Sequence, residues 1–368
     1  MNQHAFRKLI SGKTKGLSAS ILRFLLQIAA KIYSTVIGLR NLLYSKGYLK
    51  IHTADVPVIS IGNITTGGTG KTPLVIWLCK FLQRKEMQCA VLTRGYKTHS
   101  GQQAASDEPA ILTKSCPQAK VIVNPDRAAA AIEAVNKFGA KVLVMDDGFQ
   151  HRRLNRNLDI VTIDATLPFG HEKLLPAGLL REPVASLKRA DAVVLTRCDQ
   201  TSVNKLNRLK EKLRLINPNM VIARSIHAPV CAKSAKQDQI SLDELKGKNI
   251  FAFCGIGNPG AFFATIRALG AKLIDSRVYN DHHRYTDNCL ADICHRAKIL
   301  EADLLLTTQK DWFSSPLSAI ADESSEQPAI KYGIPFAYLA IELRFLSGED
   351  KITKLIEDPL AGRICKKH

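Results

Sequence analysis

The sequence predicts an α/β protein with a mostly parallel sheet, a second, smaller α/β domain and an N-terminal amphipathic helix. From residue 56 onward, short apolar runs alternate with helical segments, which is typical of parallel strands joined by crossover helices. The first 50 residues instead carry apolar side chains at helical spacing. With 368 residues and a hydrophobic content of 46%, the chain has enough apolar side chains for more than one core.

Residues 17–46 predict one long helix with an apolar stripe at spacings of three and four residues. The stripe consists of Ile21, Leu25, Ile28, Ile32, Val36, Leu39 and Leu43. Residues 1–50 contain nine basic side chains and no acidic one, within a chain whose net charge is +19. This combination favours a helix lying on an anionic membrane surface, although a helix packed on the protein's own core would show the same stripe.

The N-terminal segment does not read as a cleavable signal or a simple spanning helix. Arg23, Lys31 and Arg40 interrupt its apolar stretch, and no small-residue cleavage site follows. The nine cysteines are scattered without a C-x-x-C pair, so neither a disulfide framework nor a zinc cage is indicated. A reducing cytoplasm fits this cysteine usage best.

The apolar runs place a first domain at residues 51–225, a polar connection at 226–248 and a second domain at 249–368. Strands are expected in the first domain at residues 56–61, 90–93, 120–123, 141–145, 159–163 and 192–196. In the second domain they are expected at residues 249–254, 271–275, 303–307 and 336–343. Residues 226–248 are assigned to the connection because they contain no apolar run of strand length.

The stretch VPVISIGNITTGGTGKTPLVIWL joins an apolar strand to a helix through a glycine-rich loop. This context predicts a phosphate-binding loop and hence a phosphate-loop NTPase-type domain, with ATP as the ligand. The residues expected to bind it are Thr65, Thr66, Gly67, Gly68, Thr69, Gly70, Lys71 and Thr72. Backbone N–H groups of such a loop hold phosphate oxygens, the lysine reaches the terminal phosphates, and the threonine hydroxyl ligates Mg²⁺.

A second motif, KVLVMDDGFQH, ends a buried-type strand in two carboxylates. In a phosphate-loop enzyme, a carboxylate at this place holds Mg²⁺ directly or through water. Asp146 and Asp147, together with Thr72, are therefore the predicted metal residues.

Nine motifs in order resemble the tetraacyldisaccharide 4'-kinase family of lipid A synthesis. They are GNITTGGTGKTP, TRGYK, SDEP, PDR, DDGFQHRRL, LLPAGLLREP, GIGNPGAFFATIRALG, YNDHHRYTD and TTQKD, and they run from about residue 56 to residue 311. The resemblance implies transfer of the ATP γ-phosphate to the 4'-hydroxyl of a tetraacyldisaccharide 1-phosphate. It also implies a peripheral or monotopic enzyme on the cytoplasmic face of a bacterial inner membrane.

By resemblance, Asp107 and His282 form the catalytic pair, in which a carboxylate accepts the hydroxyl proton and a histidine orients it. Lys71 joins them as the cation at the transferred phosphate. The candidate substrate-binding residues lie in the matching motifs, on loops that follow strands, where ligands of open α/β sheets collect. They are Arg94, Tyr96, Arg127, Gln150, His151, Arg181 and Glu182.

Three other interpretations compete with this one. Thr196-Arg197-Cys198-Asp199 is loosely similar to a guanine-specifying pattern, so a membrane-associated GTPase switch is the main alternative. Gly255 to Gly260 with Asp275 satisfies a dinucleotide-binding pattern, but that pattern leaves the phosphate loop and both aspartates unexplained. A non-enzymatic membrane- or nucleic-acid-binding module fits the charge, yet it has no use for a phosphate loop and carboxylates, and an aromatic content of 6% offers no stacking platform. The sequence indicates no protein partner.

Overall fold

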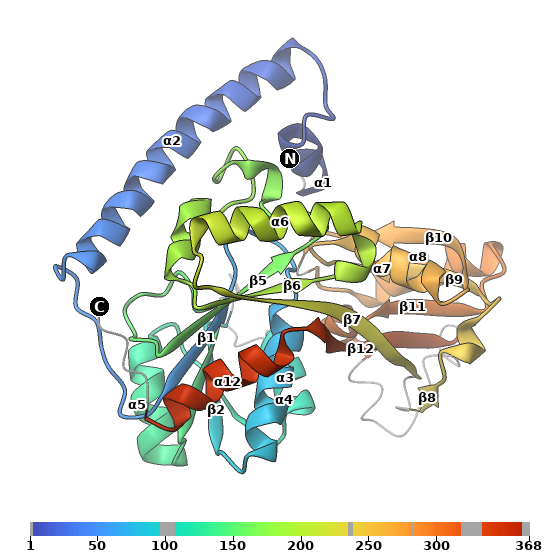
Figure 1. Ribbon diagram of the computed structural model, residues 1–368. Coiled ribbons are helices and arrows are strands. Elements are labelled where there is room, and N and C mark those ends of the chain that lie inside the picture. The colour runs from blue at the N-terminus through green and yellow to red at the C-terminus, as the bar shows by residue number, and fades with distance from the viewer. Residues whose placement is uncertain (1–2, 96–106, 235–237, 282, 318–332, 363–368) are drawn as a thin grey trace. The chain divides into compact units, whose positions relative to one another are not determined.

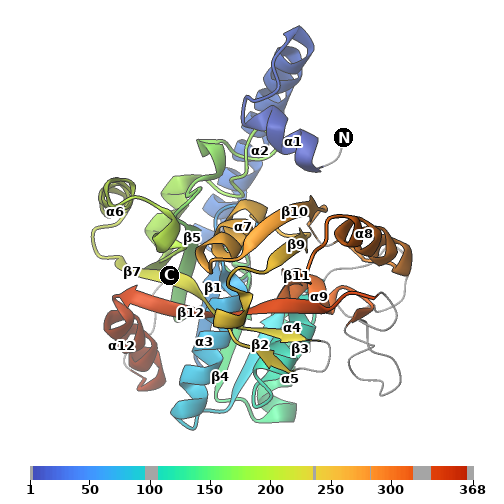
Figure 2. The ribbon, with the colours of Figure 1, turned by 90° about the vertical axis from the view of Figure 1, so that its right-hand side faces the viewer.

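The computed structural model describes residues 3–95, 107–234, 238–281, 283–317 and 333–362, and these divide into two compact units (Figures 1 and 2). The first unit takes its residues from Met1–Gly101, Leu112–Ile226 and Leu343–His368. The second takes them from Gln102–Ile111 and His227–Glu342. The predicted α/β class with a mostly parallel sheet is confirmed.

The sheet of the first unit has the order β7-β6-β5-β1-β4-β2-β3, and each neighbouring pair is parallel. Its strands are β1 (Val58–Gly62), β2 (Cys89–Thr93), β3 (Lys120–Val123), β4 (Val142–Asp146), β5 (Leu158–Asp164), β6 (Ala192–Thr196) and the start of β7 (Val221–Ser234). The central strands are buried throughout, as expected for parallel strands covered on both faces.

Successive side chains of each central strand enter different cores, because a strand alternates its faces. On β4, Val142 and Val144 pack with α3, whereas Leu143 and Met145 pack with α5. The helices of this unit are α1 (Gln3–Ile10), α2 (Leu17–Ser45), α3 (Lys71–Arg84), the end of α4 (Asp107–Ser115), α5 (Arg127–Phe138), α6 (Val203–Ile216) and α12 (Glu349–Leu360). Short 3₁₀ turns lie at η1 (Gly170–Glu172), η2 (Val184–Arg189) and η3 (Cys198–Gln200).

Helix α2, drawn in blue in Figure 1, confirms the predicted N-terminal helix. Its apolar stripe is exposed from Ile21 to Leu39, whereas Leu43 is partly buried. Its exposed large apolar side chains are Leu17, Ile21, Leu22, Phe24, Leu25, Ile28, Ile32, Val36, Leu39 and Leu42. Its most apolar 18-residue window has a mean hydropathy of 1.4, and only 6% of that window is buried. By length and composition the helix is also long enough to cross a membrane.

The strands of the second unit run in the order β10-β9-β11-β12, and each neighbouring pair is parallel. Its elements are the end of β7, β8 (Gln239–Ile240), η4 (Asp243–Leu245), β9 (Asn249–Cys254), α7 (Pro259–Ala268), β10 (Lys272–Val278), α8 (Asp287–Ile299), β11 (Leu304–Thr308), α9 (Gln309–Phe313) and most of β12 (Phe336–Ser347). Strand β9 alternates like β4: Phe251 and Phe253 face one core, and Ile250 and Ala252 face the other.

Two predicted boundaries differ from the structure. Residues 226–234 belong to strand β7 rather than to a loop connection. The buried positions of that segment are the small side chains Ala228, Cys231 and Ala232, so the strand has no apolar run to recognise. The second domain also does not extend to residue 368, because Leu343, Ile352 and Ile356 pack in the core of the first unit.

The return of the C-terminus to the first unit predicts a measurable stability effect. Ile356 is fully buried against the core that contains α3, so Ile356→Ala should lower the free energy of unfolding by about 2–5 kcal/mol. Ile299→Ala is the matched control, because that side chain is 66% exposed, and it should change the value by less than about 0.5 kcal/mol. Urea denaturation checks both values, and equal effects would contradict the packing.

Candidate functional site

The glycine-rich loop runs from the end of β1 to the first turn of α3. Gly67 and Gly70 have φ values of 114° and 90°, which side chains other than glycine rarely adopt. Thr66 N–H donates to Leu179 O at 2.8 Å, so a second segment fixes the loop. Lys71 and Thr72 therefore lie at a helix N-terminus, where backbone N–H groups and the helix dipole favour an anion.

Hydroxyl groups from two strands hold the middle of this loop. The Thr69 hydroxyl accepts from Asn63 Nδ2 at 3.0 Å and shares a hydrogen bond with the Thr162 hydroxyl at 2.8 Å. The Thr196 hydroxyl donates to Thr69 O, also at 2.8 Å. Asn63, Thr162 and Thr196 are not among the predicted binding residues. Thr162 and Thr196 lie on β5 and β6, and nothing in their local sequence connects these strands with the loop.

The two predicted metal aspartates follow β4, which lies beside β1 with Asp146 opposite Ile61. The chain then turns sharply, since Asp147 has a φ of 52° and Gly148 N–H donates to Ile61 O at 3.1 Å. This turn crosses so close to β1 that a Cβ on Gly62 would meet Phe149 Cβ at 2.6 Å. Both carboxylates are thus brought to the edge of the sheet that carries the loop.

Asp147 lies between two cations from different parts of the chain. Lys71 Nζ is 3.4 Å from its Oδ1, and Arg181 donates to its Oδ2 at 2.7 Å. Burial alone would raise the pKa of Asp147, but Lys71 and Arg181 outweigh it and hold that pKa well below its ordinary value. Asp147 is therefore a carboxylate throughout the physiological pH range.

Arg127 lies beside the two aspartates, and His151 lies near Arg127. Burial lowers the pKa of Arg127 to about 10, against the opposing effect of Asp146 and Asp147. Its guanidinium donates to Asn124 O at 2.6 Å and to Asp146 O at 3.4 Å. Burial and then the charge of Arg127 lower the pKa of His151 to about 4, so its ring is neutral at pH 7.

The remaining candidates are placed as follows. The Gln150 side chain donates to Asn63 O at 2.7 Å. Arg94 is the residue after β2, and it is exposed. Glu182 is fully buried and pairs with Arg40 and Arg189, both at 2.6 Å. Tyr96 and His282 lie outside the described residues, as does the side chain of Asp107, which begins α4.

Two sequence patterns behind the alternatives have structural partners of their own. Arg197, in the loosely guanine-like segment, pairs with Asp164 at 2.6 Å. Asp275, the acidic residue of the dinucleotide pattern, pairs with Arg296 at 2.7 Å. These ion pairs give both residues a structural role.

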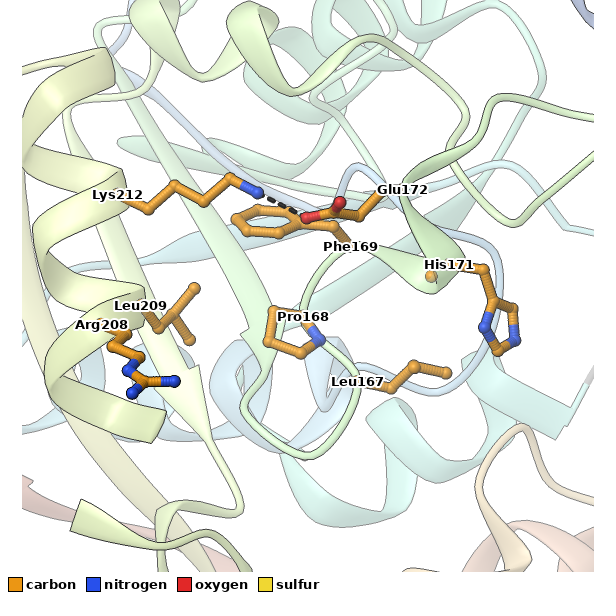
Figure 3. A pocket seen from close by; sticks show the side chains of 9 residues that line it. Leu167, Pro168, Phe169, His171, Glu172, Arg208, Leu209 and Lys212 are labelled. Atoms are coloured by element: carbon orange, nitrogen blue, oxygen red, sulfur yellow. Dashed lines mark hydrogen bonds and ion pairs between the residues drawn. The ribbon is translucent and has the colours of Figure 1, made fainter. Parts of the chain in front are cut away.

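A surface pocket of 330 Å³ lies between η1 and α6 and shares no residue with the phosphate-loop set (Figure 3). Figure 3 shows Lys212 of α6 reaching across the Phe169 ring to the Glu172 carboxylate. The pocket is lined by Leu167, Pro168, Phe169, Gly170, His171, Glu172, Arg208, Leu209 and Lys212.

The fold and the site together define a phosphate-loop enzyme that binds a nucleotide. The loop, the helix N-terminus and Lys71 suit phosphate oxygens. Within the described ranges no three histidine, cysteine or acidic side chains gather to hold a metal alone. Two carboxylates and a threonine hydroxyl fit Mg²⁺ nonetheless, because this ion takes one or two protein carboxylates and completes its shell with phosphate and water.

Comparison with known proteins identifies the family. The profile of the tetraacyldisaccharide-1-P 4'-kinase family matches residues 22–361. Tetraacyldisaccharide 4'-kinase of Halothermothrix orenii is 37% identical, over 82% of this chain and 85% of that protein. The corresponding protein of Anaeromyxobacter sp. (strain Fw109-5) is 36% identical over 91% of each. A crystal structure of LpxK from Aquifex aeolicus in complex with ATP has a TM-score of 0.67 and 30% identity, covering 92% of this chain and 99% of its own.

The chain therefore belongs to the tetraacyldisaccharide 4'-kinase family. The prediction of an ATP-dependent kinase that uses Mg²⁺ is confirmed. The family match does not support the alternative of a GTPase switch.

The depressed pKa of His151 predicts how stability depends on pH in the absence of nucleotide and Mg²⁺. The unfolded chain binds a proton at His151 below about pH 6.5, whereas the folded chain does so only below about pH 4. His151 should therefore cost stability as the pH falls through this window, by up to about 1.4 kcal/mol per pH unit. His151→Asn should remove that slope, and exposed His295→Asn should keep it. Denaturation curves across the window measure both, and a slope unchanged in His151→Asn would contradict the shift.

Proposed function

We propose that the phosphate loop, Lys71 and the Asp147–Arg181 pair form the centre that transfers the ATP γ-phosphate to the 4'-hydroxyl of a tetraacyldisaccharide 1-phosphate. The carrying observation is the ion pair of 3.4 Å between Lys71, at the start of α3, and Asp147, at the end of β4. It places a cation and a carboxylate side by side at a helix N-terminus. Mg²⁺ bound by Thr72, Asp146 and Asp147 would neutralise phosphate charge there.

The loop and Lys71 bind and orient the triphosphate. A lysine beside the transferred group stabilises the charge that its oxygens share in the transition state. Asp147 keeps Lys71 in place before the nucleotide arrives. Gly67, Gly68 and Gly70 supply backbone donors to the phosphates, together with the first residues of α3. Thr65 and Thr66 anchor the loop to residues 179 and 180, and the hydroxyl network on Thr69 keeps the loop in one shape.

Activation of the acceptor falls to Asp107 and His282. A sugar hydroxyl is a weak nucleophile, so a carboxylate that accepts its proton lowers the barrier, and a histidine can orient that carboxylate. The TTQKD and YNDHHRYTD motifs share the second unit, where Lys310 pairs with Asp281 at 2.6 Å. This ion pair holds the residue before His282.

The lipid substrate meets a cationic environment. Arg94 follows β2, and Arg127 is the first residue of α5. With Arg181, these arginines suit bidentate contact with phosphate groups, and Tyr96, Gln150 and His151 complete the proposed substrate set. Glu182 belongs to this set through Arg181, its neighbour in sequence. Its own carboxylate oxygens are both occupied by arginines.

We place the enzyme on the cytoplasmic face of the bacterial inner membrane, as a peripheral or monotopic protein. The apolar face of α2 is exposed, and residues 1–50 contain nine basic side chains and no acidic one. Both features support an anionic lipid surface as the partner of this enzyme. Delivery of an acylated substrate along that surface suits a helix that lies in the lipid interface.

Replacement of Lys71 tests the reaction. With γ-labelled ATP, Mg²⁺ and tetraacyldisaccharide 1-phosphate in detergent micelles, the intact chain should label the lipid. Lys71→Ala should lower kcat/KM by about 10²–10³-fold, because it removes a charge aimed at the transferred phosphate. Lys80→Ala, an exposed lysine of the same helix, should keep full activity. Nucleotide hydrolysis without labelled lipid would overturn the proposed transfer.

Replacement of Asp107 tests the base. Asp107→Asn should lower kcat by about 10²–10⁴-fold with the ATP affinity nearly unchanged, since a base acts on the acceptor alone. Asp350→Asn makes the same change in the first turn of α12 and should have no effect. Steady-state kinetics and an ATP-binding isotherm separate the two parameters, and a fully active Asp107→Asn enzyme would rule out the assignment.

A further inference from the structure

The segment Arg181–Glu182 is the place where helix α2 is attached to the nucleotide site. Glu182 has no exposed side-chain surface, and its two oxygens pair with Arg40 of α2 and Arg189 of η2, each at 2.6 Å. A buried carboxylate is costly when it loses a partner, because its charge stays out of water. The position of α2 is therefore linked through Arg40 to that of Glu182.

A second contact from α2 reaches Arg181 itself. The Tyr33 hydroxyl donates to Arg181 O at 2.9 Å. Tyr33, Ile37 and Arg40 follow one another at spacings of four and three residues, so they lie on one face of the helix. Each is more shielded than Ile32, Val36 and Leu39, which are 64%, 59% and 55% exposed. One side of α2 is thus bonded to the protein, and the other presents apolar side chains outward.

Arg181 connects these contacts with the site. Its backbone N–H donates to Ile64 O at 2.8 Å, just before the phosphate loop. Its side chain donates to Asp147 at 2.7 Å, and Asp147 in turn pairs with Lys71. A movement of the carbonyl that Tyr33 holds therefore reaches the loop through the backbone and the catalytic lysine through the side chain.

We propose that Tyr33, Arg40 and Glu182 are positioning residues that couple attachment of α2 to an anionic lipid surface with order at the nucleotide site. Binding of the lipid surface fixes α2, and α2 fixes Arg181 through its carbonyl and through Glu182. Nucleotide then binds a site that the lipid surface has already ordered, so its binding costs less conformational entropy. The lipid surface and the nucleotide therefore bind cooperatively. This proposal rests on the proposed membrane attachment of α2. It leaves the phosphoryl transfer itself unchanged.

Thermodynamic linkage gives the proposal a double readout. If vesicles tighten nucleotide binding by some factor, nucleotide must tighten vesicle binding by the same factor. The probes are Mg²⁺ with a non-hydrolysable ATP analogue, and vesicles of phosphatidylcholine and phosphatidylglycerol in equal parts, without lipid substrate. Isothermal titration measures the first affinity of the full chain, and co-sedimentation measures the second.

For the unmodified chain both factors should be about 5-fold, which is the size expected when one or two hydrogen bonds carry the coupling. Tyr33→Phe removes only the hydroxyl and should bring both factors close to one, with vesicle binding in the absence of nucleotide retained. Tyr48→Phe is the matched control, since that residue is 78% exposed, and it should keep the coupling. Arg40→Gln should lose it as well.

Each other outcome overturns a specific step. A chain that does not sediment with vesicles would refute the membrane attachment and the coupling with it, while the detergent assay of lipid labelling would still report on the kinase. Vesicle binding without any change in nucleotide affinity would refute the coupling alone. If Tyr33→Phe kept the same coupling factor as the unmodified chain, Tyr33 would be excluded from the coupling. If Arg40→Gln kept that factor as well, coupling through Arg181 and Glu182 would be excluded.

Discussion

The ion pairs of Asp147 with Lys71 and Arg181 determine how the rest of the site is built. Three segments far apart in sequence supply these charges, and each segment is fixed by its backbone: a glycine loop, a left-handed turn and a strand-like bridge. A carboxylate between two cations keeps its charge, so it can hold the lysine before nucleotide binds and contribute to a metal site afterwards. The loop, the turn and the Arg181 segment all depend on this arrangement.

The sequence predicts most of what depends on local pattern. Apolar runs locate the central strands, and the glycine and lysine motif locates the loop. The strand ending in Asp146 lies beside β1, which leads into that loop. Contacts between distant segments are a different matter. Nothing near Thr162 or Thr196 indicates that their hydroxyls hold Thr69, and nothing near Arg181 indicates a bond to Asp147. One sequence records no pairing between positions so far apart, and the family resemblance names the residues without their partners.

Helix α2 shows why an amphipathic pattern alone is ambiguous. Its apolar stripe is the outer face, and its attachment to the protein uses a tyrosine, an arginine and backbone groups. The apolar stripe can be recognised from the sequence because it is periodic. The polar contacts on the opposite face show no periodic pattern. The buried partner, Glu182, looks like an ordinary loop acid until the structure shows two guanidinium groups against it.

The return of β12 and α12 to the first unit affects how the chain can fold during synthesis. The core under α3 lacks Leu343, Ile352 and Ile356 until β12 and α12 have left the ribosome. The central strands that begin this unit therefore emerge long before the side chains that close it, and the entire second unit is made in between. An apolar surface beside α3 stays open for that interval, so the nucleotide-binding unit completes its core only after the second unit has been synthesised, and a ribosome stalled before residue 343 carries it unfinished.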